Sequence, residues 1–173
     1  MAGSSSRPGL PRHPRGARLS AALAALSLAL VACGKEPVTI PTLRLTQADQ
    51  AICQRLVDAL PASLGGQDRR KTQPAAALGG AWGDPPIVAQ CGVDVPTDLT
   101  RTSVCTEVDG VDWFVPPDQV DDASANAVLT AVGYRPVLQL TVPARYRGAD
   151  LGAAEAQLAP IVKQYLTPVH RCH

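Results

Sequence analysis

Residues 104–115 read VCTEVDGVDWFV, and this stretch decides how the chain is expected to fold. Apolar and polar side chains alternate on both sides of Asp109-Gly110, which is the period of a β-strand buried on one face. Asp-Gly favours a type I′ turn, so the two runs are predicted to form a β-hairpin with Trp113 facing the core. The expected cross-strand pairs are Val108 with Val111, Thr106 with Trp113, Val104 with Val115, and, on the water-facing side, Glu107 with Asp112.

Further apolar runs on either side of this hairpin predict an antiparallel sheet of about five strands. The five runs are residues 87–93, 104–108, 111–115, 127–132 and 137–142, and a turn at 133–136 joins the last two as a second hairpin. The stretch from Gly65 to Gly83 shows no apolar period, so it is predicted to be a loop.

Two helices are expected, one before the sheet and one after it. Thr46-Gln-Ala-Asp49 resembles a capping box with Asp in the place of Glu, and apolar residues then follow at helical spacing as far as Pro61. A second helical pattern starts at Asp150 and contains Pro160, which is expected to kink or divide the helix. The predicted fold class is α+β, with an N-terminal and a C-terminal helix packed on a mostly antiparallel sheet in two layers.

The first 32 residues are predicted to be a cleaved lipoprotein signal peptide. They hold four arginines and no acidic residue, and an apolar run from Leu19 to Ala32 follows the last arginine. As a helix this run would span roughly 21 Å, short of the ~30 Å hydrocarbon core of a bilayer. Leu30-Val-Ala-Cys33 resembles the bacterial lipobox, in which the cysteine carries diacylglycerol. The alternative is an ordinary secretory signal that ends at a cysteine by chance.

Lipidation of Cys33 would hold the protein at the outer face of the cytoplasmic membrane, with the membrane as its first partner. Residues 33–45 are then predicted to be the lipidated cysteine and a flexible tether, and residues 46–173 a single extracytoplasmic domain. Four of the 16 Lys and Arg residues lie in the first 32 residues, so the remaining 141 residues hold 12 basic and 15 acidic side chains. Nucleic acid is excluded as a partner, because the only basic cluster is the short run 69–71.

Four cysteines remain once Cys33 carries lipid, namely Cys53, Cys91, Cys105 and Cys172. An even number of cysteines in an oxidising compartment predicts two disulfides. Three pairings are possible, and spacing alone does not choose among them. We favour Cys91 with Cys105, which would join neighbouring strands, and Cys53 with Cys172, which would tie the first helix to the C-terminal tail. Free redox-active thiols are the alternative, but the chain has no CxxC motif.

Residues typical of catalysis are scarce. Beyond the signal peptide the only histidines are His170 and His173, and no serine lies in a GxSxG motif, so a Ser-His-Asp triad has no support. Carboxylates such as Asp109 with Asp112, or those at residues 118–122, leave an acid pair of the glycosidase kind open, and solvated turns are the alternative. We predict no catalytic residue and no cofactor.

The C-terminal residues His170-Arg-Cys-His173 place three potential metal ligands within four positions. A metal site would require Cys172 to be a free thiolate and a fourth ligand to come from elsewhere in the chain. Tail histidines beside a disulfide are the simpler interpretation, so no metal site is predicted.

Trp82 and Asp84 are the predicted binding residues. They lie in GGAWGDPP, residues 79–86, where glycines leave the indole without close neighbours and prolines stiffen the chain. A large ring on a rigid loop is a common recognition device. In the alternative interpretation, Trp82 folds over the edge of the sheet and its indole N–H bonds to a backbone carbonyl.

The segments AWGDPPIV (81–88), CGV (91–93) and DGVDW (109–113) together form a familiar pattern. On these segments the chain resembles the uncharacterised lipoproteins of domain-of-unknown-function family 3515 from high-GC Gram-positive bacteria, over about residues 46–172. Cys105 departs from that pattern. The resemblance implies a location and a type of domain, but it implies no activity and no catalytic residue.

These observations favour a non-enzymatic envelope domain that binds an envelope protein, a peptide or a cell-wall component. The main alternative is an envelope enzyme that acts on a cell-wall component through carboxylates. A structural or metal-handling lipoprotein is the third hypothesis. An enzyme would need a pocket that holds acids with perturbed pKa values, whereas a binding domain needs an accessible apolar or aromatic surface.

Overall fold

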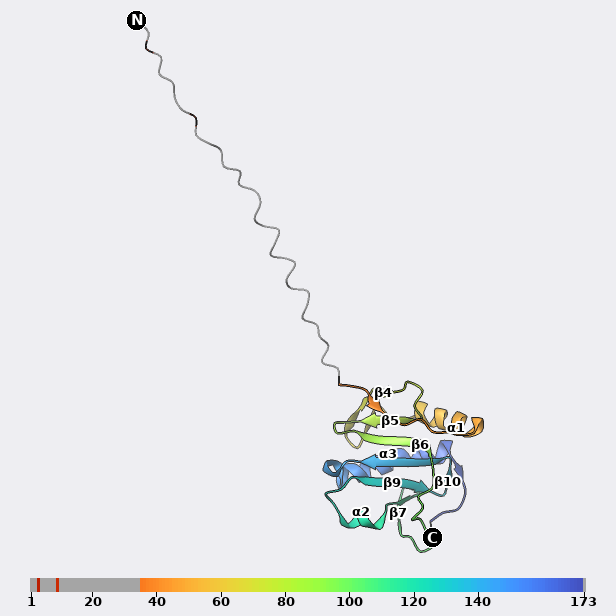
Figure 1. Ribbon diagram of the computed structural model, residues 1–173. Coiled ribbons are helices and arrows are strands. Elements are labelled where there is room, and N and C mark those ends of the chain that lie inside the picture. Colours follow the sequence, from red (N-terminus) through yellow and green to blue (C-terminus); the bar gives the residue numbers. More distant parts are fainter. Residues whose placement is uncertain (1–2, 4–8, 10–34, 173) are drawn as a thin grey trace. The chain divides into compact units, whose positions relative to one another are not determined.

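A computed structural model describes residues 3, 9 and 35–172 of the protein (Figure 1). The signal peptide predicted over residues 1–32, apart from residues 3 and 9, and the lipidation site predicted at Cys33 lie outside the described residues. Residues from Lys35 onward form one compact unit. Among the described residues, no helix is both long enough and apolar enough to cross a membrane.

The centre of the fold is an eight-stranded sheet with the strand order β2-β3-β5-β6-β11-β9-β8-β7, in which every pair of neighbours is antiparallel. Its strands are β2 (Ser63–Leu64), β3 (Gln67–Arg70), β5 (Gly79–Trp82), β6 (Ile87–Val93), β7 (Cys105–Val108), β8 (Val111–Phe114), β9 (Ala127–Val132) and β11 (Val137–Val142). The antiparallel arrangement is confirmed, but the expected number of about five strands is wrong.

The extra strands β3 and β5 lie where the sequence predicted a loop, and β2 ends just before that stretch. β5 reads GGAW and all four of its residues are buried, so it lacks the alternation by which strands are recognised. Its glycines are required by packing, since a Cβ at Gly79 would collide with the carbonyl oxygen of Ala89 on β6, and one at Gly80 would lie 2.7 Å from the Trp82 ring. The residue types in β5 are therefore determined by packing against β6 and the Trp82 ring, and not by an alternation of apolar and polar side chains.

The hairpin predicted at residues 104–115 is confirmed for strands β7 and β8. Asp109 and Gly110 both have positive φ angles, 49° and 81°, as a type I′ turn requires. The pairs Val108–Val111 and Thr106–Trp113 are those expected from the turn. The pairing of Val104 with Val115 is wrong, because β7 starts at Cys105 and Val104 is 86% exposed.

Helix α1 (Gln47–Asp58) begins at the predicted capping box, where the Asp49 backbone N–H donates to Thr46 Oγ1 at 3.1 Å. Helix α3 (Ala149–Tyr165) runs through Pro160 without being divided. Helix α1 packs against β5, β6 and α3, and α3 also contacts β2, β7 and β8 (Figure 1). Both helices contribute to one hydrophobic core, which contains Trp82 and, as predicted, Trp113.

The remaining elements are short. They are β1 (Val38–Thr39), β4 (Thr72–Gln73), α2 (Pro117–Asp121), β10 (Tyr134–Arg135), the 3-10 helix η1 (Ala144–Tyr146) and β12 (Thr167–Pro168). Strand β1 pairs with β4, and the next residue, Ile40, is fully buried. This part of the segment predicted as a flexible tether is therefore held on the domain, because it gains a strand partner and a place in the core for Ile40.

The structure contains two disulfides, as predicted, but the favoured pairing is wrong. Cys53 bonds to Cys91, with their Cα atoms 5.5 Å apart, and Cys105 bonds to Cys172, with a Cα separation of 6.2 Å. Three strands, β11, β9 and β8, lie between the strand of Cys91 and that of Cys105, so these two residues are too far apart to bond. Cys53 on α1 instead faces Cys91 on the helix side of β6.

Candidate functional site

The C-terminal tail after α3 runs back along the sheet and forms one wall of the candidate site. Strand β12 pairs with β10, and the Val169 backbone N–H then donates to the Gly133 carbonyl at 2.7 Å. Gly133 has a φ of +84°, and a Cβ there would lie 2.7 Å from the His170 carbonyl oxygen. Glycine therefore permits both the turn and the close approach of the tail.

Arg171 and Cys172 hold the end of the tail. Arg171 donates two hydrogen bonds to the buried Asp112 carboxylate, at 3.0 and 3.2 Å, and one to Glu107 Oε2 at 3.1 Å. The hydrogen bonds with Asp112, followed by its charge, raise the pKa of Arg171 above its ordinary value. The Cys172 backbone N–H also donates to Asp112, and the Cys105–Cys172 disulfide adds a covalent link to β7. The tail is therefore fixed to the hairpin.

The opposite wall is the connection from β6 to β7, residues 94–104. It joins a central strand to the edge strand, so it passes β11, β9 and β8. The side chains of Val132 on β9 and Phe114 on β8 alternate with core residues, so they point to the face of the sheet turned away from α1 and α3. Both side chains line pockets beside this connection.

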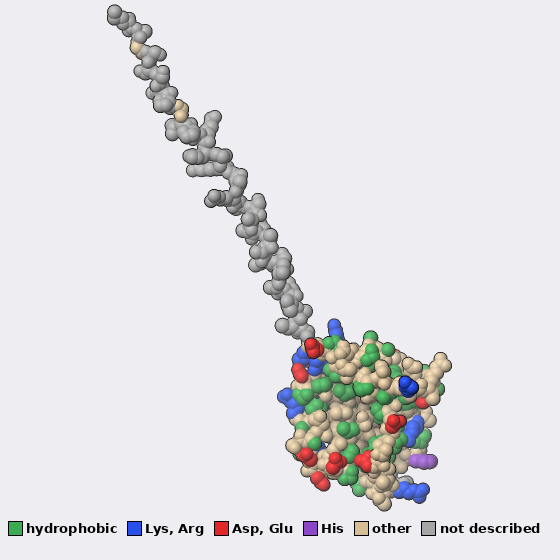
Figure 2. All heavy atoms as spheres, in the orientation of Figure 1, with side chains coloured by type: hydrophobic (Ala, Val, Ile, Leu, Met, Phe, Trp, Pro, Cys, Tyr) green, Lys and Arg blue, Asp and Glu red, His purple; other side chains and the backbone are tan. Residues whose placement is uncertain are grey.

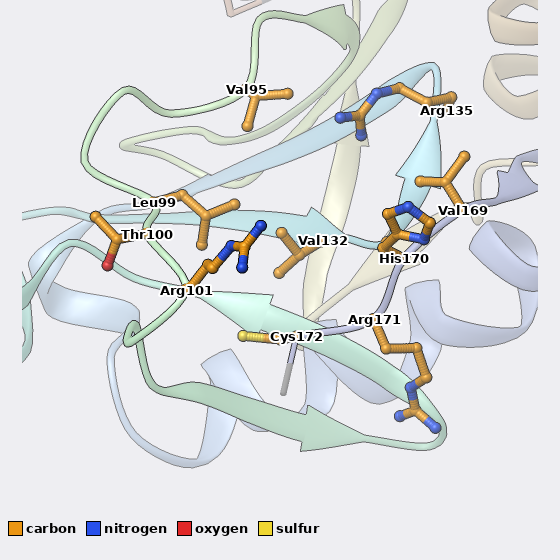
Figure 3. Close-up of a pocket in the computed structure, with 11 residues that line it drawn as sticks. Val95, Leu99, Thr100, Arg101, Val132, Arg135, Val169, His170, Arg171 and Cys172 are labelled. Carbon is orange, nitrogen blue, oxygen red and sulfur yellow. The ribbon is translucent and has the colours of Figure 1, made fainter.

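The first pocket, here called the arginine pocket, lies between the tail, the connection and the end of β9, and its volume is about 390 Å³ (Figure 3). It is lined by Val95, Leu99, Thr100, Arg101, Val132, Gly133, Arg135, Val169, His170, Arg171 and Cys172. This volume lies within the range of small-molecule sites.

The charge of the arginine pocket is one-sided. Among the described residues that line it, none is acidic. Arg101 and Arg135 take part in none of the ion pairs found within the described part of the chain. Figure 3 shows both guanidinium groups directed toward the space between the connection and the tail, whereas Arg171 points away toward the β7–β8 hairpin. Two guanidinium groups that form no ion pair within the described residues, above an apolar floor, can bind an oxyanion through paired hydrogen bonds.

A second pocket of about 400 Å³ lies on the other side of the connection, and Thr100 lines both pockets. Its lining combines polar residues, including Asp98 and Asp121, with apolar ones that include Phe114, Val104, which is 86% exposed, and Val120, which is 59% exposed. On the face shown in Figure 2, several acidic side chains gather at the lower left, and basic side chains lie mainly at the upper left and the right. The two pockets adjoin at Thr100 and share the 94–104 connection as a wall.

Trp82, the first predicted binding residue, has no exposed surface. Its indole Nε1–H donates to the Pro61 carbonyl at 3.0 Å, and the Arg69 guanidinium lies 5.5 Å from the ring centroid. This environment agrees with the alternative interpretation, in which the ring covers the edge of the sheet. It does not leave the indole accessible to a partner.

Asp84, the second predicted binding residue, is more than half exposed but lies far from the arginine pocket in the fold. Its carboxylate lies 3.5 Å from Lys35 Nζ and 3.8 Å from Arg70 Nη1, and its carbonyl accepts a hydrogen bond from Tyr146 Oη at 3.1 Å. These contacts fasten the first residues of the domain to the end of β5. The two predicted binding residues therefore do not form one site.

The carboxylates considered for catalysis are dispersed. Asp112 is taken up by Arg171 and the Cys172 backbone, and Asp118 and Asp121 lie on the short helix α2. Among the described acidic residues, the one whose pKa is raised is Glu155, and it lines none of the pockets described above. No acid pair with perturbed pKa values is therefore found in a pocket of the described residues.

Glu155 gives a testable pH dependence. Burial raises the pKa of this carboxyl from 4.5 to about 7, so the folded protein binds the proton more tightly than the unfolded chain. Stability should therefore fall as the pH rises from about 4.5 to about 7. Glu155→Gln should be about 2 kcal/mol more stable than wild type at pH 8, and no more stable at pH 4, in urea denaturation.

The control for this experiment is Asp150→Asn, which changes an exposed carboxylate in the first turn of the same helix. Its stability relative to wild type should vary little between the two pH values. If Glu155→Gln gave the same difference at pH 4 and pH 8, the buried carboxyl would not be the source of the pH dependence.

The metal hypothesis required Cys172 as a free thiolate, but Cys172 is bonded to Cys105. His173 lies outside the described residues. Within residues 35–172, the structure brings together no group of three or more His, Cys, Asp or Glu side chains that could hold a metal ion.

Sequence reasoning missed the arginine pocket, because its residues come from a loop, a turn and the tail. One feature of the sequence could have indicated that the C-terminal tail contacts the β7–β8 hairpin. The hairpin register places Glu107 opposite Asp112, and a pair of like charges on neighbouring strands calls for a cation between them. Arg171 is that cation.

Comparison with known proteins gives one match. A protein-family model described as "Protein of unknown function (DUF3515)" matches residues 17–170, which is most of the chain. No curated protein and no solved structure matches the chain.

Proposed function

Because the chain belongs to the family of proteins of unknown function DUF3515, we propose a function from its own sequence and site: it is an exported, lipid-anchored envelope domain that binds its ligand in the arginine pocket. The domain acts by binding and not by catalysis. A partner from the cell envelope, such as a wall component or an envelope protein, occupies the pocket while diacylglyceryl Cys33 holds the domain at the outer face of the cytoplasmic membrane.

The sequence supports the anchor. An arginine-bearing segment, a short apolar run and a cysteine preceded by small residues follow one another in the order of a lipoprotein signal. The compact unit starts at Lys35, only two residues after Cys33. Arg70 Nη2 donates to the Glu36 carbonyl at 2.6 Å, so the chain is already attached to the domain at this point. The anchor would therefore hold the domain close to the membrane.

The observation that supports binding is the construction of the arginine pocket. One wall is fixed by a disulfide, by the Arg171–Asp112 ion pair and by the β10–β12 pairing. A wall that is already in place loses little conformational entropy when a ligand enters. The alternative of a carboxylate-dependent enzyme has less support, because Glu155, the described acid with a raised pKa, does not line the pocket.

We expect a photo-crosslinking residue at Val169, which is 48% exposed and lines the pocket, to capture a specific envelope partner in living cells. The same residue at Arg55, exposed on α1, should capture none. Cys33→Ser should leave the precursor uncleaved or release the protein without lipid, and it should reduce the Val169 crosslinks, since the domain would no longer be held beside its partner.

The two parts of the proposal fail separately. A Cys33→Ser protein that keeps the mass and the membrane partition of the lipidated form would refute the anchor. Identical crosslinks from positions 169 and 55, or none from either, would refute binding in the arginine pocket.

A further inference from the structure

We infer that the ligand of the arginine pocket carries an oxyanion, a phosphate or a carboxylate, together with an apolar portion, and that it reaches the pocket from the cell-wall side of the membrane. This inference rests on the proposed function and adds to it the chemical class and the source of the ligand. An anionic wall polymer with an apolar substituent meets these conditions, whereas a lipid of the anchoring membrane would approach from the other side.

The oxyanion follows from the two arginines. Guanidinium groups present planar pairs of N–H donors that match the oxygens of a phosphate or a carboxylate. Arg135 donates one hydrogen bond, to the Tyr134 carbonyl at 2.8 Å, and has donors to spare. The described structure gives Arg101 no side-chain hydrogen bond at all, and its guanidinium lies against Val132 in Figure 3. His170 contributes further ring nitrogens to the same pocket.

The apolar portion follows from the remaining lining. Val95, Leu99, Val132 and Val169 lie in the same pocket, and Val95 and Val169 are exposed to 38% and 48%. Beyond Thr100 the surface continues into the second pocket, where Val104, Phe114 and Val120 add apolar surface beside Asp98 and Asp121. A ligand with an anionic group at the arginines and an apolar part on these side chains would remove both kinds of surface from water. A bare inorganic anion would use only half of the site.

The direction of approach follows from strand register. Lys35 lies beside Asp84, just after the last residue of β5, and the Trp82 end of β5 lies alongside Ile87 at the start of β6. Strand β11 pairs with both β6 and β9, and through it the start of β6 lies at the same edge of the sheet as Ala127 at the start of β9. Val132 in the arginine pocket lies three strands across from β5 and at the opposite strand end, which is on the order of 20 Å away.

The residues near the anchor carry exposed charges of both signs, and the acidic ones are Glu36, Asp68 and Asp84. Lys35 is 62% exposed on its side chain, and Arg145 and Lys71 are exposed in the same part of the fold. If Cys33 carries the proposed lipid, only two residues before Lys35, this corner of the domain would be the one nearest the membrane, and the arginine pocket at the opposite corner would be accessible from the wall.

The test titrates the domain from Lys35 to the C-terminus, which has its own core, with inorganic phosphate and with a soluble glycerol-phosphate oligomer that carries a butyl group as its apolar portion. Binding is followed by NMR shifts of the arginine side-chain N–H groups. We expect the oligomer to bind more tightly than phosphate and to shift Arg101 and Arg135. Arg101→Gln and Arg135→Gln should each weaken binding about tenfold, and Arg55→Gln should leave it unchanged.

A second arm adds vesicles of phosphatidylcholine that contain phosphatidylglycerol. Vesicle binding that depends on Arg101 and Arg135 would make a lipid headgroup the ligand and would overturn the wall-side placement. Oligomer binding that is absent, or equal in all variants, would overturn the oxyanion. If crosslinks from Val169 persisted in that case, the proposed binding function would stand with a different ligand class. If they were also absent, both proposals would fail.

Discussion

Trp82→Ala is expected to lower the free energy of unfolding by about 3–5 kcal/mol, because it removes a large side chain with no exposed surface from the core. The change leaves a cavity beside Gly80, which adjoins the ring and has no side chain to fill the space. It also leaves the Pro61 carbonyl without its donor and Arg69 without the ring it covers. Urea denaturation of the domain followed by circular dichroism measures the loss.

The matched control is Val104→Ala, since Val104 is 86% exposed and its truncation should change stability by less than about 0.5 kcal/mol. Crosslinks from Val169 should survive Trp82→Ala under conditions where the variant is still folded, because Trp82 lines no part of the arginine pocket. A variant with wild-type stability that had lost those crosslinks would mean that Trp82 is a contact residue after all.

The elements that could be predicted are those with a strong local signal. Asp109-Gly110 requires a tight turn of one type, and the turn then determines the register of the flanking pairs. The capping box at Thr46 likewise marks the start of α1 through a bond between residues three apart. In both cases the atoms that decide the structure are close together in the chain.

β5 and β3 could not be predicted in the same way. β5 is a strand because β6 and β3 supply hydrogen bonds on both sides, and its glycines allow the backbones to approach. β3 reads QDRR, whose charged residues belong to a strand near the edge of the sheet and not to a loop. Such strands are defined by tertiary contacts, and tertiary contacts override local propensity.

The arginine pocket could not be predicted for the same reason, because it is formed by tertiary contacts. Its cationic residues Arg101 and Arg135 lie 34 positions apart, and each is an ordinary exposed arginine when viewed alone. They share a pocket because the 94–104 connection crosses the sheet and the tail returns along β10. Trp82 attracted attention in the sequence for its size, but size is also what makes burial favourable.

The double change Cys53→Ala with Cys91→Ala is expected to lower stability by about 4 kcal/mol, because this disulfide closes a loop over 38 positions and restricts the unfolded chain. Both cysteines are fully buried between α1 and β6, so the variant also loses core contacts. Thermal unfolding should show a melting temperature lower by about 12–16 °C.

Comparison with a Cys105→Ala, Cys172→Ala variant separates the structural disulfide from the one that builds the site. The Cys105–Cys172 disulfide closes a loop over 67 positions, so its removal should cost a similar amount of stability, about 4 kcal/mol. However, the Cys105→Ala, Cys172→Ala variant should also release the tail and reduce crosslinking from Val169 at temperatures where the domain is folded. The Cys53→Ala, Cys91→Ala variant should keep that crosslinking. Equal crosslinking by both variants would mean that the tail holds its place through Arg171 and Asp112 without the disulfide.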